Sequence, residues 1–286
     1  AMIAVPAGTV RLGTPEAALD ALAGQQAYPR SWFEDESPQH PVELAAFWID
    51  AHPVTNAAFT AFTEATGHRT AAEIRGSSLV YGPGYWQETP GACWRHPGGI
   101  GDRIDDRMDH PVVHVDYADA RAYAAWADRR LPTEAEWEHA AHGPDWRPWP
   151  WGTTWDRGRV NCAEHQAARP LGDLGEWKTW WTERYARHGT VPATTPVTAF
   201  SPAGDSPFGM SDMAGNVAEW TATRYCLYDP GRRYDPLYHA ATGRYQVVRG
   251  GGWMNLRHQL RTSERFAIDP AYASHATGFR CAADTP

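Results

Sequence analysis

A short polar stretch near the carboxyl end carries the side chains best suited to acid–base chemistry. It places Asn255, Arg257, His258, Arg261 and Glu264 within ten residues. Only His258 among them ordinarily titrates near neutral pH, and Glu264 could orient it or pair with Arg261. Asn255, His258, Arg261 and Glu264 are therefore our candidate catalytic residues. The alternative is a polar loop with surface ion pairs.

Oxygen-bearing side chains cluster at a second position in the sequence, around Gly215. Asp212, Asn216 and Glu219 fall within eight residues there, and the flexible glycine allows backbone carbonyls to turn inward. Calcium takes about six to eight hard oxygen ligands of this kind. The pattern predicts a calcium site, and the alternative is a solvated acidic turn.

The histidines outside these two places are less informative. His110 and His114 stand beside apolar residues on an expected strand or turn, where packing is commoner than metal ligation. His139 and His142 lie one turn apart on an expected short helix without a third ligand nearby. We expect both of the latter at the surface.

The cysteines indicate the redox setting. Cys93, Cys162, Cys226 and Cys281 are too widely spaced for a CxxC metal site and too few for a disulfide scaffold. The first residues show no basic region followed by an apolar one, so we expect no export signal and a reducing, cytoplasmic location. An export signal that has already been removed is the alternative.

Composition limits the classes of partner. The net charge is −8 and the pI about 5.9, which lacks the basic footprint of a nucleic-acid binder. The longest apolar run, 44–49, is far shorter than the ~20 residues of a membrane helix. We therefore expect a small-molecule or peptide substrate, no nucleic acid and no membrane. The 26 Gly, 23 Pro and 15 Trp predict many loops braced by aromatic rings.

The elements that must position these residues are those of one α+β domain over 1–286 with little regular structure. Strands are expected within 3–13, at 42–49 and at 245–249. Helices are expected at 55–66, 117–130 and 134–142, because Thr55, Asp116 and a Thr133/Glu136 capping box precede apolar residues at helical spacing. The chain after Pro144 reads as irregular. The Trp-rich segment 171–191 permits a helix and is predicted to be a surface insertion.

Several short strings, taken together and in order, resemble the formylglycine-generating enzyme (sulfatase-modifying factor) family over nearly the whole chain. WRHP at 94–97 favours that enzyme's own branch over the related sulfoxide synthases. The strings are DHPVVHV at 109–115, RLPTEAEWE at 130–138, PWG at 150–152, GM at 209–210, GNVAEW at 215–220, RGGGW at 249–253 and GFRC at 278–281.

The resemblance implies a C-type-lectin-like fold of low regular structure, braced by calcium. Residue by residue, the family's calcium site falls on the Asp212 and Glu219 side chains with the Gly215 and Val217 carbonyls. A second family site begins at Asn161, but its remaining ligands belong to the stretch that the insertion alters.

The resemblance breaks down at the family's active site. Two cysteines there hold the copper ion that is used to oxidise the cysteine of a Cys-x-Pro-x-Arg peptide, and their positions carry Asn255 and Leu260 here. A pocket serine maps to Gly252 and a nearby tryptophan to Ala218. Cu(I) prefers soft thiolates, and none of these residues supplies one. We therefore expect no formylglycine generation.

Two functions remain. The first is an enzyme, an oxidoreductase-type tailoring catalyst for a small molecule or peptide, whose catalytic metal, if it uses one, is unidentified. The second is a non-catalytic peptide- or ligand-binding module on the same scaffold. Both use the altered pocket, in which Gly252, Trp253, Arg257 and Leu260 are expected to contact the substrate. A deep pocket with converging polar groups favours the enzyme, and a flat Trp-rimmed face favours the binder.

Overall fold

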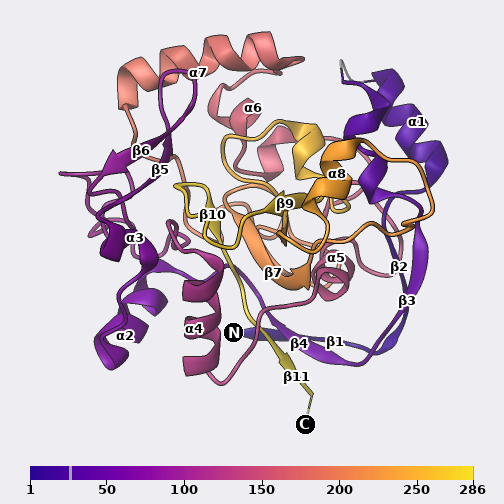
Figure 1. Ribbon diagram of the computed structural model, residues 1–286, viewed down its shortest axis with the longest axis horizontal. Coiled ribbons are helices and arrows are strands. Elements are labelled where there is room, and N and C mark those ends of the chain that lie inside the picture. Colours follow the sequence, from indigo (N-terminus) through magenta and orange to yellow (C-terminus); the bar gives the residue numbers. More distant parts are fainter. Residues whose placement is uncertain (26–27, 286) are drawn as a thin grey trace.

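A four-stranded mixed sheet lies near the middle of the molecule, and helices and long loops surround it (Figure 1). The computed structural model describes residues 1–25 and 28–285. The helices are α1 Glu16–Gln25, α2 Asn56–Thr66, α3 Ala71–Arg75, α4 Tyr117–Trp126, α5 Glu134–His142, α6 Ala163–Gln166, α7 Leu174–His188 and α8 Pro236–Ala241, with the 3-10 turns η1 Arg30–Trp32, η2 Glu34–Glu36, η3 Arg157–Arg159 and η4 Arg257–Leu260.

The strands of the described residues form four small sheets. The central sheet has the order β10-β7-β8-β9, and a second has the order β1-β4-β11, so both chain ends lie beside β4 (Figure 1). The other two sheets are the pairs β2-β3 and β5-β6. The strands are β1 Met2–Val5, β2 Gly8–Leu12, β3 His40–Leu44, β4 Phe47–Asp50, β5 Ser77–Tyr81, β6 Trp86–Pro90, β7 Ala218–Arg224, β8 Gln246–Arg249, β9 Phe266–Ile268, β10 Thr277–Gly278 and β11 Ala282–Asp284.

Local capping chemistry sets the helices, and the α+β class is confirmed. Thr55 accepts a hydrogen bond from Ala58 N at the start of α2, and Gly67 ends that helix with φ +69°. Thr133 and Glu136 form the expected capping box at the start of α5. The helices expected at 55–66 and 134–142 are therefore confirmed, because each carries its own start and stop signals.

The helix expected at 117–130 is shorter than predicted. It begins after Asp116 as expected but ends at Trp126, because Asp128 takes a left-handed conformation with φ +54°. Arg130 then joins β11 in a bridge with Ala282. Its guanidinium pairs with Glu136 at 2.7 Å and with Asp284 at 2.6 Å. Tertiary pairing at Arg130 thus overrides the helical spacing of the sequence.

The main core joins the helices to the central sheet. Phe59 of α2, Tyr123 of α4 and Trp220 of β7 pack there with Trp94 and Phe279, all buried. Trp220 Nε1 donates to Val115 O at 3.0 Å, so its one polar atom is satisfied. No helix in the described part of the chain is long and apolar enough to cross a bilayer.

The segment 171–191 forms the long helix α7 on the outside of the molecule (Figure 1). One face is nevertheless buried, through Trp177, Trp180, Trp181 and Arg184. Trp177 Nε1 donates to Met254 O at 2.7 Å, and Trp181 Nε1 donates to Gly82 O at 2.6 Å. The helix is therefore fastened to the β5–β6 hairpin and to the loop after β8.

The expected surface position of His139 and His142 is wrong. The two side chains are buried on the inner face of α5, and burial lowers the pKa of each to about 4. His114 is fully buried as expected of a packing residue, and its ring nitrogens lie 2.8 Å from Ser78 Oγ and from Pro97 O.

Candidate functional site

The site is built on the turn that follows β8. Gly250 and Gly251 have φ of +85° and +64°, a conformation that favours glycine. A Cβ on Gly251 would lie 2.6 Å from Gln259 O, so this position has no room for a side chain. The chain then turns back through η4, and Asn255 Oδ1 accepts from Gly252 N at 2.7 Å.

A cavity of about 370 Å³, the Asn255 cavity, opens beside this turn. Its walls come from elements far apart in the sequence. Tyr81 and Trp86 come from the β5–β6 hairpin, Trp177 from α7, and Val248 and Phe266 from β8 and β9. The ring centroids of Tyr81 and Trp177 lie 5.4 Å apart at 77°, an edge-to-face contact. The cavity is thus mainly aromatic and apolar.

Two amides supply the polar groups of the loop that borders the cavity. The side-chain oxygen of Asn255 is engaged by Gly252 N, and that of Gln259 accepts from Leu256 N at 3.1 Å. The NH₂ group of each amide has no hydrogen-bond partner among the described residues. Both can therefore donate to a carbonyl oxygen of a ligand.

The described lining of the cavity contains no cysteine, histidine, lysine, arginine or acidic side chain. Besides Asn255 and Gln259, its polar members are the hydroxyls of Tyr81, Tyr272, Ser274 and Thr277. Burial raises the pKa of Tyr272 to about 12. These side chains can bind and orient a ligand, but none of them is ordinarily a base or a thiolate near neutral pH.

Only Asn255 among the candidate catalytic residues lines this cavity. The expectation that His258 lies there is wrong. Its ring packs against Tyr28 at 4.1 Å between centroids and against Phe33 at 6.1 Å. Burial, with the charges of Arg261 and Arg257, lowers its pKa to about 3. His258 is therefore a neutral packing residue near pH 7.

Arg261 and Glu264 also lie outside the cavity, in a buried ion cluster. Arg261 Nη1 and Nη2 contact Glu36 Oε2 and Oε1 at 2.6 and 2.5 Å, and Nη2 contacts Glu264 at 2.7 Å. Glu264 does pair with Arg261, which was one of its expected roles. The alternative, a polar loop with surface ion pairs, is wrong for Arg261, because its ion pairs with Glu36 and Glu264 lie in the interior. These charges fasten η4 to η2.

Of the four expected substrate contacts, none lines the Asn255 cavity. Leu260 is fully buried against Val160, Cys162 and Ala214, and Trp253 is fully buried against His275. Arg257 points to a different hollow, which it lines with Trp155 and Glu164. Gly252 does not line the cavity, and a Cβ at this position would lie 3.1 Å from the backbone oxygen of Ala276, which does.

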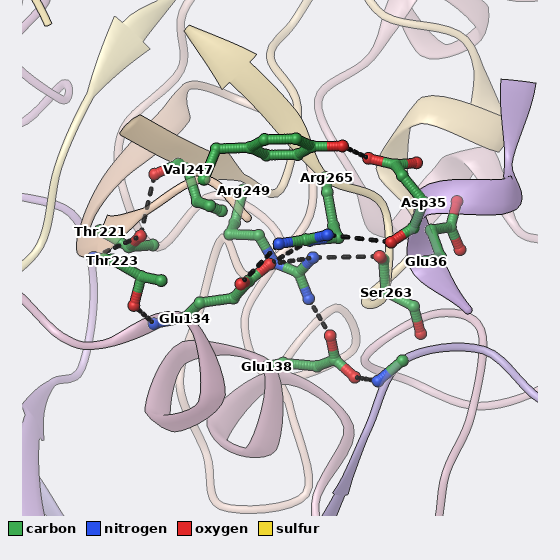
Figure 2. Close-up of polar contacts among 12 residues, drawn as sticks. Asp35, Glu36, Glu134, Glu138, Thr221, Thr223, Val247, Arg249, Ser263 and Arg265 are labelled. Atoms are coloured by element: carbon green, nitrogen blue, oxygen red, sulfur yellow. Dashed lines mark hydrogen bonds and ion pairs between the residues drawn. The ribbon is translucent and has the colours of Figure 1, made fainter. Parts of the chain in front are cut away.

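A larger buried charge network holds the sheet that floors the cavity (Figure 2). Arg265 Nε contacts Glu134 at 2.6 Å, and Arg249 contacts Glu134 and Glu138. Glu138 also accepts from Gly13 N at 2.6 Å, and burial raises its pKa to about 7. Neither this network nor the aromatic walls could be predicted from local sequence patterns, because their members lie far apart in the chain. The Trp-rich composition was the one available signal for the walls.

The residues around Gly215 are only partly arranged as a calcium site. Asn161 Nδ2 donates to Asn216 Oδ1 at 3.1 Å, and Asn216 Nδ2 donates to Asp212 Oδ2 at 2.8 Å. These three side chains form one chain of hydrogen bonds, so Asn161 lies close to the Gly215 turn. Burial raises the pKa of Asp212 to about 7, and none of the described basic side chains forms an ion pair with it.

Glu219 does not join that chain of hydrogen bonds. Arg280 contacts both of its oxygens at 2.7 Å, and Trp137 Nε1 donates to Oε2 at 2.8 Å. In the described chain, no group of three or more His, Cys, Asp or Glu side chains is arranged to hold a metal ion. Asp212 has no ion-pair partner among the described residues and so remains available to a cation, whereas both oxygens of Glu219 are already engaged by Arg280. No sequence pattern predicted the ion pair between Arg280 and Glu219.

Similar proteins support the resemblance over the whole chain. The formylglycine-generating enzyme of Thermomonospora curvata is 38% identical over 309 residues, covering 99% of this chain and 93% of that protein. The inactive C-alpha-formylglycine-generating enzyme 2 of Bos taurus is 34% identical, covering 98% and 87%.

Structural comparison agrees on the fold. PvdO of Pseudomonas aeruginosa superposes with a TM-score of 0.60 at 24% identity, covering 99% of this chain and 94% of that one. The sequence model of the sulfatase-modifying factor enzyme 1-like domain matches residues 1–285. The chain therefore belongs to the sulfatase-modifying factor enzyme 1-like family.

Proposed function

We propose that the protein is a ligand-binding member of the family that does not generate formylglycine. Its ligand presents an apolar or aromatic group next to a carbonyl, as a peptide or an N-acyl small molecule does. The observation that carries this proposal is the lining of the Asn255 cavity. Aromatic walls accept the apolar group, and the free NH₂ groups of Asn255 and Gln259 are suited to the carbonyl oxygen.

The test fills the cavity with the residue that the family carries. Ala218 lies on β7 in the lining, whereas Ala222 lies on the same strand and is exposed. Binding of N-acetyl-L-phenylalanine methylamide is measured by quenching of tryptophan fluorescence. Ala218→Trp should abolish binding, and Ala222→Trp should leave it unchanged. Equal binding by both variants and by the unmodified protein would place the ligand elsewhere and overturn the proposal.

A second arm separates a peptide-like ligand from a purely apolar one. Toluene offers the aromatic ring without the carbonyl groups. We expect the capped amino acid to bind more tightly than toluene, because only the former can accept from the two amides. Equal affinities would show that the amides take no part, and would overturn the carbonyl half of the proposal.

An oxidoreductase-type tailoring activity is the second candidate, and it stays a prediction. Relatives named as formylglycine-generating enzymes, at 31–38% identity, support it. The described lining of the cavity offers hydroxyls and amides, so such an activity would depend on a bound cofactor for its electrons. Consumption of oxygen that depends on both the capped amino acid and this protein would favour it.

We further propose that a structural calcium ion at the Gly215 turn is held through Asp212, with the Gly215 and Val217 carbonyls. Family membership and the buried Asp212 without an ion-pair partner support this assignment. Calcium should raise the melting temperature of the unmodified protein, and Asp212→Asn should remove that rise. If chelation leaves the unmodified melting temperature unchanged, the assignment fails.

A further inference from the structure

A second cavity, of about 420 Å³, lies between the carboxyl-terminal half of α7 and the chain around α6. Its charged lining is mostly basic: Arg169, Arg184, Arg187 and His188, with Glu183 as the one acid among the described lining residues. Trp180 forms an apolar wall. We call it the Arg184 cavity. It is distinct from the Asn255 cavity, with which it shares no lining residue.

Arg184 is the most deeply placed charge of this cavity. The residue is 8% exposed, whereas the side chains of Arg187 and Glu183 are 68% and 59% exposed. Its Nη2 donates to Val191 O at 2.5 Å, and its Nη1 is buried and has no hydrogen-bond partner among the described residues. The guanidinium also lies 4.5 Å from the ring centroid of Trp253.

The charge of Arg184 is not neutralised within the described structure. No acidic side chain there forms an ion pair with it, in contrast to the buried Arg249, Arg261, Arg265 and Arg280. Burial alone lowers its pKa to about 10. A buried charge without a counter-charge is costly, and contact with an aromatic face offsets only part of that cost. An anion in the cavity would supply the missing partner.

The end of α7 offers a simpler explanation for part of the cluster. Basic side chains are favourable in the last turn of a helix, which accounts for Arg187 and His188. It does not account for Arg184, which lies one turn earlier and is buried. The cavity is also larger than a bare ion requires, and Trp180 offers a surface for an organic group.

We propose that the Arg184 cavity binds a small organic oxyanion, either a carboxylate or a phosphate ester, through the guanidinium of Arg184. Arg169 and Arg187 at the rim attract the anion, and Trp180 contacts its organic part. A guanidinium binds either oxyanion through paired N–H donors.

The test uses benzoate and phenyl phosphate as probes, titrated calorimetrically into the intact protein, with sodium chloride at matched ionic strength as the control. At least one probe should bind saturably. Arg184→Gln should weaken binding by about tenfold or more, since a hydrogen bond to a charged group is lost. Arg233→Gln removes the same charge from an exposed position before α8 and should leave the affinity unchanged.

A rim variant keeps the test decisive if Arg184→Gln fails to fold. Arg187→Gln lies at an exposed position and should weaken binding by about two- to fivefold. The proposal is overturned if neither probe binds at millimolar concentration. It is equally overturned if the Arg184 and Arg187 variants that fold bind the probes as tightly as the unmodified protein does. That result would show that the probe binds as an adventitious ion only.

Discussion

Arg280 forms a bidentate ion pair with Glu219, with Nε 2.7 Å from Oε2 and Nη2 2.7 Å from Oε1. Both side chains are fully buried. Arg280 also donates to the carbonyls of Ser211 and Asp212 and to that of Asp50. One guanidinium thereby joins β7, the loop before it and β4. The GFRC and GNVAEW strings of the sequence meet at this contact.

Loss of this pair should be strongly destabilising. Glu219→Gln leaves the buried Arg280 without a counter-charge, so we expect the free energy of unfolding to fall by about 3 kcal/mol in urea titrations. Glu183→Gln breaks the exposed pair with Arg187 and should cost no more than about 0.5 kcal/mol. The loss at Glu219 should be the same with and without calcium. A loss that appears only in calcium would make Glu219 a ligand after all.

The sequence predicted the parts of the fold that depend on local chemistry. The helix boundaries at Thr55, Gly67 and Thr133 could be predicted, because each capping residue bonds to a residue only three or four positions away. The helix expected to reach Arg130 ends at Trp126 instead, and Arg130 pairs with Ala282, which is too far away in the chain for a local pattern to reveal. The same limit applies to the site. Asn255 was identified from a short string, whereas the walls from Tyr81 and Trp177 required long-range pairing that no string encodes.

The misassigned candidates failed for a physical reason. His258, Arg261 and Glu264 have the residue types of a catalytic group, but spacing alone does not reveal which side of the chain faces the cavity. Glu36, more than two hundred residues away, takes Arg261 into the interior. A charged residue in the sequence is thus compatible both with a catalytic role and with a buried ion pair, and only the position of its partner in the fold distinguishes the two.

The pH dependence of stability should report the buried state of His258. Its folded pKa of about 3 lies below its ordinary 6.5, so the unfolded chain binds more protons between those values. The stability from neutral His258 is therefore full above pH 6.5 and is lost as the pH falls toward 3. When the pH falls from 7 to 5, protonation of His258 in the unfolded chain should lower the free energy of unfolding by about 2 kcal/mol.

The variant His258→Gln isolates this contribution from the other buried groups. Glu138, with its raised pKa, acts in the opposite direction, because its protonation on acidification stabilises the fold. The difference in unfolding free energy between pH 7 and pH 5 should shrink by about 2 kcal/mol in His258→Gln. The exposed His239 provides the control, as His239→Gln. An unchanged difference in His258→Gln would show that His258 protonates freely in the folded protein.

The amide of Gln259 should contribute to ligand affinity through its NH₂ group. Gln259→Glu keeps the oxygen that accepts from Leu256 N but replaces the donor by an acceptor. Affinity for N-acetyl-L-phenylalanine methylamide should fall about tenfold, with little change in affinity for toluene. Gln87→Glu, in the β5–β6 hairpin but outside the cavity lining, is the control. Equal losses for both ligands would indicate a general disturbance of the cavity.

The protein should not convert a Cys-x-Pro-x-Arg peptide to formylglycine, even with added Cu(I). A two-thiolate copper centre needs soft ligands, and the amide of Asn255 and the hydrocarbon of Leu260 supply none. The existing thiols do not replace them. Cys162 packs against Leu260 but is fully buried, and burial raises its pKa to about 12, so it stays protonated. None of the four cysteines lines the Asn255 cavity.

Mass spectrometry of the peptide provides the measurement, with the Thermomonospora curvata enzyme assayed beside it as the positive control. We expect the peptide mass to stay unchanged with this protein while the control converts it. Because Leu260 points into the interior and away from the cavity, Asn255→Cys alone should remain inactive as well. Conversion of the peptide cysteine to the aldehyde that depends on this protein would contradict the prediction, and would require a route to oxidation that uses no paired thiolates.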